Sequence, residues 1–486
     1  MSPGDETAVS VAAGDPVELL AAYVTASESY DEAVAGDGRP RPVALPVLAA
    51  VAGQDLDALA GSLMDDIAGI GMTFRSVEGD ARFVVDPIPR VLSADEWRSL
   101  EVGLAQRVRA LNAFVADVYG ERRVVAEGVV PERVIETASY FEPLMDGFRP
   151  PNGLWIGVAG PDVVRDASGE FQVLEDNVRS PSGFVYALAI REALSARLGG
   201  TAAGLARALD EAPDWLAGAF AAAAPDAAGD RPQTVVLSDG PHSAAYWEHR
   251  WLATHLDAPL AGSHELEQDD RQLWLRPPGA RTRRRIDVVY NRTSSDRLDS
   301  PLGQLLLEPL RAGTLGMVNV FGTGVADDKL THAYVEDIVR FYLGEEPKIR
   351  SVPTLDLGRP EVLEEALDRF DELVIKPRRG YGGIGVVICR DADRSELEAA
   401  RRAVRAHPAG YIAQHLVCLS THPTVIEGRL ARRHVDLRPY VFLGADDATH
   451  VMPGGVTRVA LQDGALIVNA SQNGGAKDTW VLRDGR

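Results

Sequence analysis

Acidic and amide side chains gather between Asp162 and Asn177, where their spacing predicts a site for a hard cation. An extended strand ending in Val173-Leu-Glu-Asp-Asn177 would place Glu175 and Asn177 on one face, about 7 Å apart along the backbone. Asp162 begins the first strand of a predicted hairpin turning at 166–169, and a loop of two or four residues would pair it with Val173, diagonally beside Glu175. Carboxylate and amide oxygens are ligands that Mg²⁺ prefers. An edge hairpin with a solvated acidic face is the alternative interpretation.

Lysine is rare in this chain, so the positions of the few lysines carry information. Of the 50 basic residues, 46 are arginine, and the lysines are Lys329, Lys348, Lys376 and Lys477. A retained lysine is consistent with a role for a compact, flexible ammonium group that a planar guanidinium cannot fill. Codon bias alone would give the same composition. Lys348, in Glu-Glu-Pro-Lys, has the sequence context of an ordinary surface residue.

A glycine-rich segment follows Lys376 and contains Gly380, Gly382 and Gly383. The pattern from Leu373 to Ile388 predicts a strand, a flexible turn and a second strand. Such a turn can fold over phosphate groups with its backbone N–H groups. It is neither a P-loop nor a Rossmann fingerprint, because Gly-Lys-Ser/Thr is absent and a strand follows in place of a helix. A plain glycine-rich hairpin is the alternative.

The elements that must position these residues can be predicted from periodicity. A capping box at Ser93–Glu96 starts a long amphipathic helix that runs to Gly120, and its Arg107 and Arg109 are interpreted as solvated. Alternating strand and helix patterns at 234–238, 242–255 and 286–290 are typical of a parallel αβ layer. Further expected elements are helices at 182–198, within 201–231 and at 331–343, and strands at 411–417 and 433–438, the last with Asp436 and Arg438 on one face.

Composition excludes several classes of function. The chain has 486 residues, ordinary apolar and charged fractions (45% and 25%) and a net charge of −21. This charge argues against nucleic acid or an anionic membrane as the principal partner. Two cysteines cannot form a disulfide framework, and neither a signal peptide nor a transmembrane run of about 18 apolar residues is recognisable. We therefore expect a cytoplasmic protein, with an oligomeric state that the sequence leaves open.

From about Tyr30 to Leu482 the chain resembles the circularly permuted ATP-grasp proteins of the second type, relatives of glutathionylspermidine synthase. The resemblance rests on several long motifs in a shared order. They are Ile88-Pro-Arg90, Leu174-Glu-Asp-Asn177 with Arg179 and Pro-Ser-Gly183, Gly322-Thr-Gly-Val-Ala-Asp-Asp-Lys329, Arg433-His-Val-Asp-Leu-Arg-Pro439, Pro453-Gly-Gly-Val-Thr-Arg458 and Lys477-Asp-Thr-Trp480.

The resemblance implies an α+β fold in which two α+β lobes clasp ATP, with a Rossmann-like αβ layer before the ATP-grasp part and an N-terminal helical region. The implied division is a loosely ordered tail (1–28), helical region (29–135), metal-binding part (136–228), αβ domain (229–318) and ATP-binding lobes (319–486).

The resemblance also implies residue roles. It makes ATP and Mg²⁺ the expected cofactors, with Asp162, Glu175 and Asn177 as metal ligands. Lys329 and Lys376 would hold phosphates, Gly380, Gly382 and Gly383 would form the phosphate loop, and Gln414 would lie near the adenine. Arg438 would face the γ-phosphate or an acyl phosphate. Arg179, Lys376 and Arg438 are the expected catalytic residues.

The implied activity is ATP-dependent joining of a carboxylate and an amine, small molecules or peptides, through an acyl phosphate. Such chemistry needs no protein nucleophile, and His242, His249, His434 and the two cysteines are interpreted as structural or surface residues. Two departures from the family, Tyr290-Asn-Arg-Thr-Ser-Ser295 and Asn473 in the C-terminal glycine-rich loop, put substrate contacts in doubt. A nucleotide-binding scaffold and phosphotransfer without amide formation remain alternatives.

Overall fold

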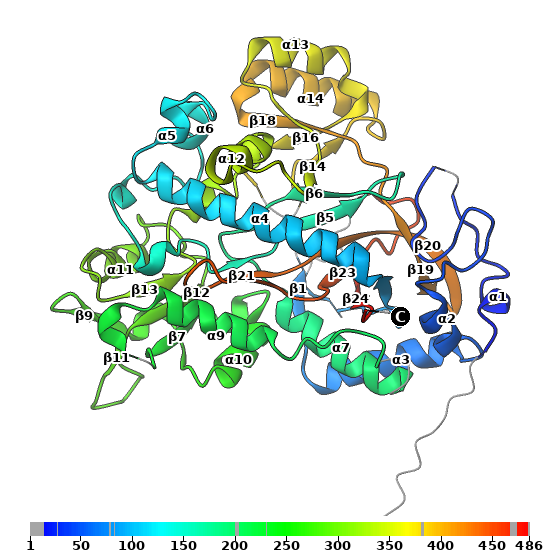
Figure 1. Ribbon diagram of the computed structural model, residues 1–486, viewed down its shortest axis with the longest axis horizontal. Helices are drawn as coiled ribbons and strands as arrows, with labels where there is room; N and C mark the ends of the chain where they lie inside the picture. Colours follow the sequence, from blue (N-terminus) through cyan, green and yellow to red (C-terminus); the bar gives the residue numbers. More distant parts are fainter. Residues whose placement is uncertain are drawn as a thin grey trace, which may run out of the picture.

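The computed structural model describes residues 14–26, 28–76, 79–81, 83–199, 204–229, 231–380, 383–466 and 474–484. Figure 1 shows the long helix α4 (Ala94–Val118) running through the middle of the molecule, with a small lobe above it and a parallel sheet below. Ser93 caps this helix and forms the predicted capping box with Glu96, because each side chain accepts a hydrogen bond from the other residue's backbone N–H. The predicted helix is confirmed and ends two residues before Gly120.

The largest sheet joins segments from both ends of the chain. Its strands lie in the order β14-β6-β5-β20-β23-β24-β3, and β19 pairs with the first part of β20. Strand β3, near the N-terminus, runs parallel to β24, near the C-terminus, with Arg90 opposite Thr479. The bounds are β3 Arg90–Leu92, β5 Asp162–Arg165, β6 Phe171–Glu175, β14 Arg350–Ser351, β19 Thr421–Ile426, β20 Arg429–Arg438, β23 Val456–Val459 and β24 Gly475–Val481.

A parallel four-stranded sheet lies in the segment where the sequence predicts an αβ layer (Figure 1, lower left). Its order is β13-β12-β7-β8, with bounds β7 Thr234–Ser238, β8 Leu260–Ala261, β12 Val288–Arg292 and β13 Gly316–Val318. Helix α10 (Tyr246–His255) connects β7 to β8, and α9 (Ala212–Ala223) packs on β13. The strand–helix–strand pattern is confirmed, although the helix begins four residues later than predicted. The domain boundaries stay predictions.

The small lobe has a hydrophobic core of its own. Its antiparallel sheet has the order β15-β18-β16-β17, with bounds β15 Thr354–Asp356, β16 Leu373–Pro377, β17 Val387–Ile388 and β18 Tyr411–His415. Helices α13 (Pro360–Asp368) and α14 (Arg394–Ala406) cover this sheet (Figure 1, top). The buried side chains of this core are Leu357, Ala366, Leu367, Phe370, Leu373, Ile375, Cys389, Ala400, Val404 and Ala413. The main core lies in the rest of the molecule and also includes Ile412 of β18.

The remaining elements are short or peripheral. The helices are α1 Pro16–Leu19, α2 Leu45–Val51, α3 Leu56–Gly69, α5 Arg123–Ala126, α6 Glu132–Glu136, α7 Phe184–Leu198, α11 Pro301–Arg311 and α12 Val335–Leu343. The strands are β1 Phe74–Ser76, β2 Gly79–Ala81, β4 Val158–Ala159, β9 Leu266–Asp269, β10 Gln272–Leu275, β11 Arg284–Ile286, β21 Val441–Leu443 and β22 Thr449–Val451. Within the described part of the chain, no single helix is long and apolar enough to cross a membrane, and only α2 and α3 together, bent by 95°, meet that criterion.

Candidate active site

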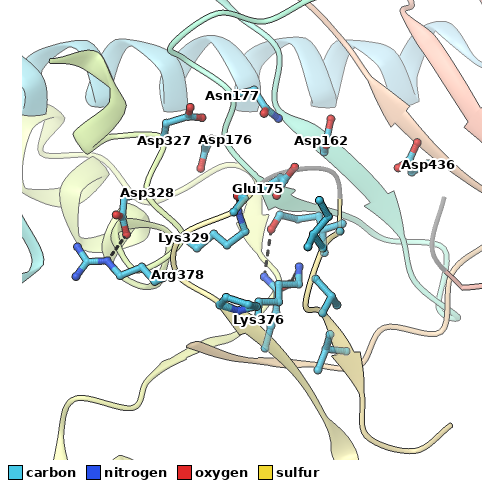
Figure 2. A pocket seen from close by; sticks show the side chains of 18 of the residues that line it. Asp162, Glu175, Asp176, Asn177, Asp327, Asp328, Lys329, Lys376, Arg378 and Asp436 are labelled. Atoms are coloured by element: carbon cyan, nitrogen blue, oxygen red, sulfur yellow. Dashed lines mark hydrogen bonds and ion pairs between the residues drawn. The ribbon is translucent and has the colours of Figure 1, made fainter. Parts of the chain in front are cut away.

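A cavity of about 730 Å³ lies between the small lobe and the large sheet, and every described residue of the predicted site lines it. These residues are Asp162, Glu175, Asn177, Arg179, Lys329, Lys376, Gly380, Gly383, Gln414 and Arg438. Gly382, with Tyr381, lies outside the described residues. Figure 2 shows Asp162, Asn177 and Asp327 on one side of the cavity and the two lysines on the other, with Asp328 beside Lys329. Segments more than 270 residues apart in sequence therefore meet at one place.

Glu175 and Asn177 line the cavity where β6 ends, with Asp176 between them. Asp176 is anchored in the molecule's interior: its carboxylate accepts two hydrogen bonds from Arg107 of α4, each 2.7 Å long, and lies 3.1 Å from His332 Nδ1. Burial would raise the pKa of Asp176, but Arg107 and His332 hold it well below its usual range. Fixing the middle residue fixes its neighbours, because side chains alternate along an extended backbone.

The prediction that Arg107 is solvated is wrong. Its side chain is 2% exposed and pairs with Asp176, and its Nη1 donates to Ser351 Oγ at 2.9 Å. The helical periodicity placed Arg107 beside apolar positions, but no local pattern pointed to the carboxylate that neutralises it, which lies 69 residues away in the chain.

The predicted hairpin forms, but with a different register. Val163 pairs with Val173, and a β-bulge then places Asp162 directly opposite Glu175. The loop at 166–170 is held by the Asp166 side chain, which accepts hydrogen bonds from the backbone of Ser168 and Glu170. The predicted pairing of Asp162 with Val173 is wrong, because the loop has an odd number of residues and the bulge takes up one more. Asp162 and Glu175 are nevertheless neighbours, because the bulge pairs them directly, whereas a diagonal contact was predicted.

Four charged side chains alternate across β5, β20 and β23 on the cavity floor. Asp162 accepts hydrogen bonds from Arg438 Nε at 2.6 Å and Nη2 at 2.8 Å, and Arg458 Nη2 lies 2.8 Å from its second oxygen. Arg458 also contacts Asp436, its cross-strand neighbour, at 2.5 Å. Burial would raise the pKa of Asp162, but the two guanidinium groups hold it well below its usual range. Burial raises the pKa of Asp436 in spite of Arg458.

Both arginines line the cavity and have one guanidinium nitrogen without a described partner. The Nη1 atoms of Arg438 and Arg458 have no hydrogen-bond partner within the described segments, and both side chains line the cavity. A guanidinium whose other edge is fixed by a buried carboxylate is pre-oriented to bind an anion. The array can therefore stabilise negative charge at the cavity floor.

Two lysines reach the cavity from different elements. Lys376, on β16, donates to Gln414 Oε1 at 2.6 Å, and the Gln414 amide donates to Leu174 O and Thr354 Oγ1. Gln414 thus orients Lys376, and its predicted place near the adenine stays a prediction. Burial lowers the pKa of Lys376, while the Glu175 carboxylate opposes the shift.

Lys329 approaches the glycine-rich segment directly. Its Nζ donates to Gly380 O at 3.1 Å, and no carboxylate pairs with it among the described side chains. Gly380 has φ +135°, a conformation that L side chains rarely adopt, so glycine is required where the chain turns over Lys329. Two ammonium groups that no described carboxylate neutralises can hold the oxygens of a polyphosphate.

Asp327, Arg179 and Asp296 form a second charged cluster, which borders the cavity on the side of the parallel sheet. Arg179 contacts both carboxylates, with Nε 3.4 Å from Asp327, and its guanidinium lies 3.9 Å from the ring centroid of Tyr140. Burial raises the pKa of Asp327 to about 6; Arg179 opposes the shift and the charge of Glu175 adds to it.

Several cavity residues were absent from the predicted site. They are Asp327, Asp328, Arg378, Arg458 and Asp436. The Asp327-Asp328 pair precedes Lys329, and Arg378 follows Lys376 by two positions, so adjacency was the available signal for these residues. No motif encoded the β20–β23 register that places Arg458 opposite Asp436.

The remaining lysines and His249 lie outside the cavity lining. Lys477 is fully buried and pairs with Asp86, and Lys348 pairs with Glu345 at the surface. His249 is buried against Ser238, with 2.8 Å between Nδ1 and Oγ. In the C-terminal loop, residues 467–473, including Asn473, lie outside the described residues.

The donors fit a divalent cation that also binds a phosphate-bearing ligand. Among the described residues, no three histidine, cysteine or acidic groups form a ready metal cluster. The Asn177 amide nitrogen is buried without a hydrogen-bond partner, so it can donate to an oxygen of a phosphate-bearing ligand, and Glu175, which lines the same cavity, has no ion pair with a described residue. Mg²⁺ is usually bound by one or two carboxylates plus substrate phosphates, so Glu175 and Asn177 suit it without a complete protein cage.

The amino-acid sequence is similar to a known protein family and to several bacterial proteins. The family model described as circularly permuted ATP-grasp type 2 matches residues 89–460. The chain is 41% identical over 501 residues to "Putative glutamate--cysteine ligase 2-2" of Frankia casuarinae, covering 98% of this chain and 56% of that protein. It is 39% identical over 470 residues to an uncharacterized protein of Synechocystis, covering 93% and 97% of the two chains.

Among solved structures, a glutathione synthetase-like effector (GSS30) from Globodera pallida, in its apo form, has a related fold. The TM-score is 0.56 at 10% sequence identity, with 88% of this chain and 98% of that chain covered. At this identity the likeness concerns the fold alone. Because the chain spans little more than half of the Frankia relative, that protein's name describes a longer molecule.

Proposed function

Since the chain belongs to the circularly permuted ATP-grasp type 2 family, we propose that it is an ATP-dependent carboxylate–amine ligase that works through an acyl phosphate. The observation that carries the proposal is the single cavity in which a cation site, two lysines and two anchored arginines meet. We also assign the parallel sheet as the Rossmann-like layer of the predicted architecture, and α2 to α6 as its N-terminal helical region.

The apolar end of the cavity suits the adenine ring. The apolar side chains that line it include Leu174, Val374, Val386, Ile388, Leu416, Val417 and Leu419. Ligand pockets of this kind combine apolar walls with a few placed polar groups. The polar end, with Lys329 and Lys376, would then receive the phosphates.

The charge of the triphosphate requires several cations. Lys329 and Lys376 would hold phosphate oxygens from two sides, and Gly380 and Gly383 would let the backbone approach them. Glu175 and Asn177 would hold Mg²⁺, which when bound neutralises charge on the phosphate oxygens. We assign Asp162 a different task from the predicted one, because three guanidinium contacts already occupy its carboxylate.

The reaction would proceed in two displacements. A substrate carboxylate oxygen attacks the γ-phosphorus, the bond to the β–γ bridging oxygen breaks, and ADP leaves. An amine then attacks the acyl carbon, the carbon–oxygen bond breaks, phosphate leaves, and the nitrogen loses a proton. Negative charge on the transferring phosphoryl group would be stabilised by Arg438 and Arg458, which Asp162 and Asp436 hold in place.

The substrates belong to a class that the relatives suggest. The printed names of the Frankia and Globodera proteins, a glutamate–cysteine ligase and a glutathione synthetase-like effector, point to amino acids and short peptides. These compounds are therefore the first carboxylates and amines to assay.

The test is Mg·ATP turnover by the purified chain with pooled amino acids and short peptides. ADP would be quantified, products identified by mass, and the acyl phosphate trapped with hydroxylamine. Glu175→Gln should lower ADP formation about 100-fold or more, because a cation ligand is lost. Glu170→Gln, in the exposed turn of the same hairpin, is the matched control and should leave turnover unchanged.

Each alternative function gives its own result. ATP binding without ADP formation in any pool would favour a nucleotide-binding scaffold. A stable phosphorylated product that hydroxylamine cannot trap would favour phosphotransfer without amide formation. Equal turnover by wild type and Glu175→Gln would contradict the proposed mechanism.

A further inference from the structure

The small lobe has its own core; Ile412 of β18 joins it to the main core, and polar contacts also connect it to the rest of the molecule. The contact beside the phosphate lysines is made by Arg378, the first residue after β16. Its side chain is 5% exposed, and that of Asp328 is 4% exposed. A buried ion pair of this kind is sensitive to the loss of either partner.

Arg378 contacts three groups of the large part of the molecule at once. Its Nε donates to Asp328 Oδ1 at 2.6 Å, its Nη1 to Thr137 Oγ1 at 2.5 Å, and its Nη2 to Val134 O of α6. Asp328 is itself fixed, because the same oxygen accepts from the backbone N–H of Leu330 at 2.9 Å. The planar fork of arginine carries its donors on three separate nitrogens, so it reaches acceptors that lie too far apart for the single nitrogen of a lysine.

The two partners of this ion pair are close in sequence to the two lysines of the cavity. Asp328 directly precedes Lys329, and Arg378 follows Lys376 by two residues. Figure 2 shows the pair beside Lys329 at the edge of the cavity. A second bridge, from Lys329 Nζ to Gly380 O, joins the same two segments.

We propose that Arg378, through Asp328, is a positioning residue that sets the separation of Lys329 and Lys376 and thereby forms the triphosphate site. This inference rests on the proposed function, because it requires that the cavity binds ATP. Each of the three guanidinium nitrogens of Arg378 already donates a hydrogen bond, to Asp328, Thr137 or Val134. Arg378 would therefore affect ATP binding by positioning the lysines and not by contacting the nucleotide. The apolar slot proposed for the base is lined by other residues, none of which is hydrogen-bonded to Arg378.

The test compares the affinity of the full chain for ATP and for adenosine, measured by calorimetry. Arg378→Ala and Asp328→Asn should each weaken ATP binding about 10- to 100-fold, because a misplaced supporting group costs that much at a site. Adenosine affinity should fall much less, because the residues proposed to contact the base make no hydrogen bond with Arg378. Arg378→Lys, which keeps the charge and loses the fork, should fall between Arg378→Ala and wild type, and Arg378→Ala/Asp328→Asn should be no weaker than the worse single variant.

The control is Arg369→Ala, which removes an exposed ion pair with Glu372 on the same lobe and should leave both affinities unchanged. Equal losses of ATP and adenosine affinity in Arg378→Ala would mean a general structural role and would overturn the inference. Unchanged ATP affinity would overturn it as well. A wild-type chain that binds adenosine and ATP equally, or neither, would contradict the proposed function itself and this inference with it.

Discussion

Neighbouring carboxylates in the cavity differ in what already neutralises them, and this difference decides which can bind a cation. Asp162, Asp176 and Asp436 each contact arginine side chains. Glu175 has no ion pair within the described structure, and Asp327 has only one contact of 3.4 Å with a guanidinium nitrogen. A carboxylate already bound by a guanidinium would have to break that contact before it could bind a metal ion. Glu175 is therefore the best placed of the five to serve as a metal ligand.

The first prediction separates positioning of arginines from metal binding at Asp162. With Mn²⁺ as a paramagnetic probe in the presence of ATP, Asp162→Asn should bind the metal–nucleotide complex as tightly as wild type. Turnover should fall about 100-fold, because Arg438 and Arg458 lose the carboxylate that orients them. Glu175→Gln, measured alongside, should lose metal affinity. Equal losses of metal affinity in both variants would instead make Asp162 a ligand, as the resemblance implied.

The second prediction concerns His249, whose pKa is lowered to about 3, first by burial and then by Arg292. The unfolded chain takes up a proton near pH 6.5, whereas the folded chain does not, so the stability contributed by neutral His249 is present above pH 6.5 and lost as the pH falls toward 3. Between pH 7.5 and 5 this linkage costs about 2 kcal/mol. Urea unfolding at the two pH values should show that loss in wild type, and His249→Asn should lose about 2 kcal/mol less. Parallel pH profiles for the two proteins would rule out a buried neutral imidazole.

Among the elements, α4 and the β5–β6 hairpin show how far periodicity can lead. The Ser93 capping box and the apolar stripe of α4 are local features, and they predicted the helix to within two residues of its end. The register of the hairpin was mispredicted, because it depends on the Asp166 hydrogen bonds within a five-residue loop and on a bulge. Local chemistry predicts which element forms; the partner of a side chain on that element depends on distant segments.

The third prediction tests the link between α4 and the strand that carries Glu175. Arg107→Met would leave the buried Asp176 without its cation and should lower the free energy of unfolding by about 3–5 kcal/mol. Replacing both partners, in Arg107→Met/Asp176→Leu, should recover most of that loss, because no unpaired buried charge remains. Arg109→Met, on the same helix and half-buried, should change stability by no more than about 0.5 kcal/mol. If Arg107→Met and Arg109→Met cost the same in urea unfolding, the ion pair does not anchor the strand.

For the whole molecule, the sequence predicted which residues would meet but not how each would be held. Lys329, Lys376 and the 162–177 segment could be brought together because each motif has its own chemistry and the order of motifs resembles a known family. The partnership of Arg458 with Asp436 and Asp162, and that of Arg378 with α6, depend on strand register and lobe placement, which no single motif encodes. Lys477 shows the limit of this reasoning. The rarity of lysine suggested a functional role for it, whereas its ammonium group pairs with Asp86 in the interior and joins the C-terminal strand to that segment.

The last prediction follows from the presence of two cores. A lobe with a separate core can open without unfolding the rest, so its amides exchange through a local opening. Under the proposed function ATP would contact both parts, and at 100 times its dissociation constant it should stabilise the closed lobe by about 2.7 kcal/mol. Hydrogen exchange should therefore slow about 100-fold at amides of β16 and β18, and remain unchanged at β7 and β12 in the parallel sheet. Adenosine at the same multiple of its own dissociation constant should protect the same amides to a similar degree. Uniform protection of both sheets by ATP would show that the lobe and the body unfold as one cooperative unit. In that case the contacts of Arg378 and Lys329 would not be the ones that hold a separate lobe in place.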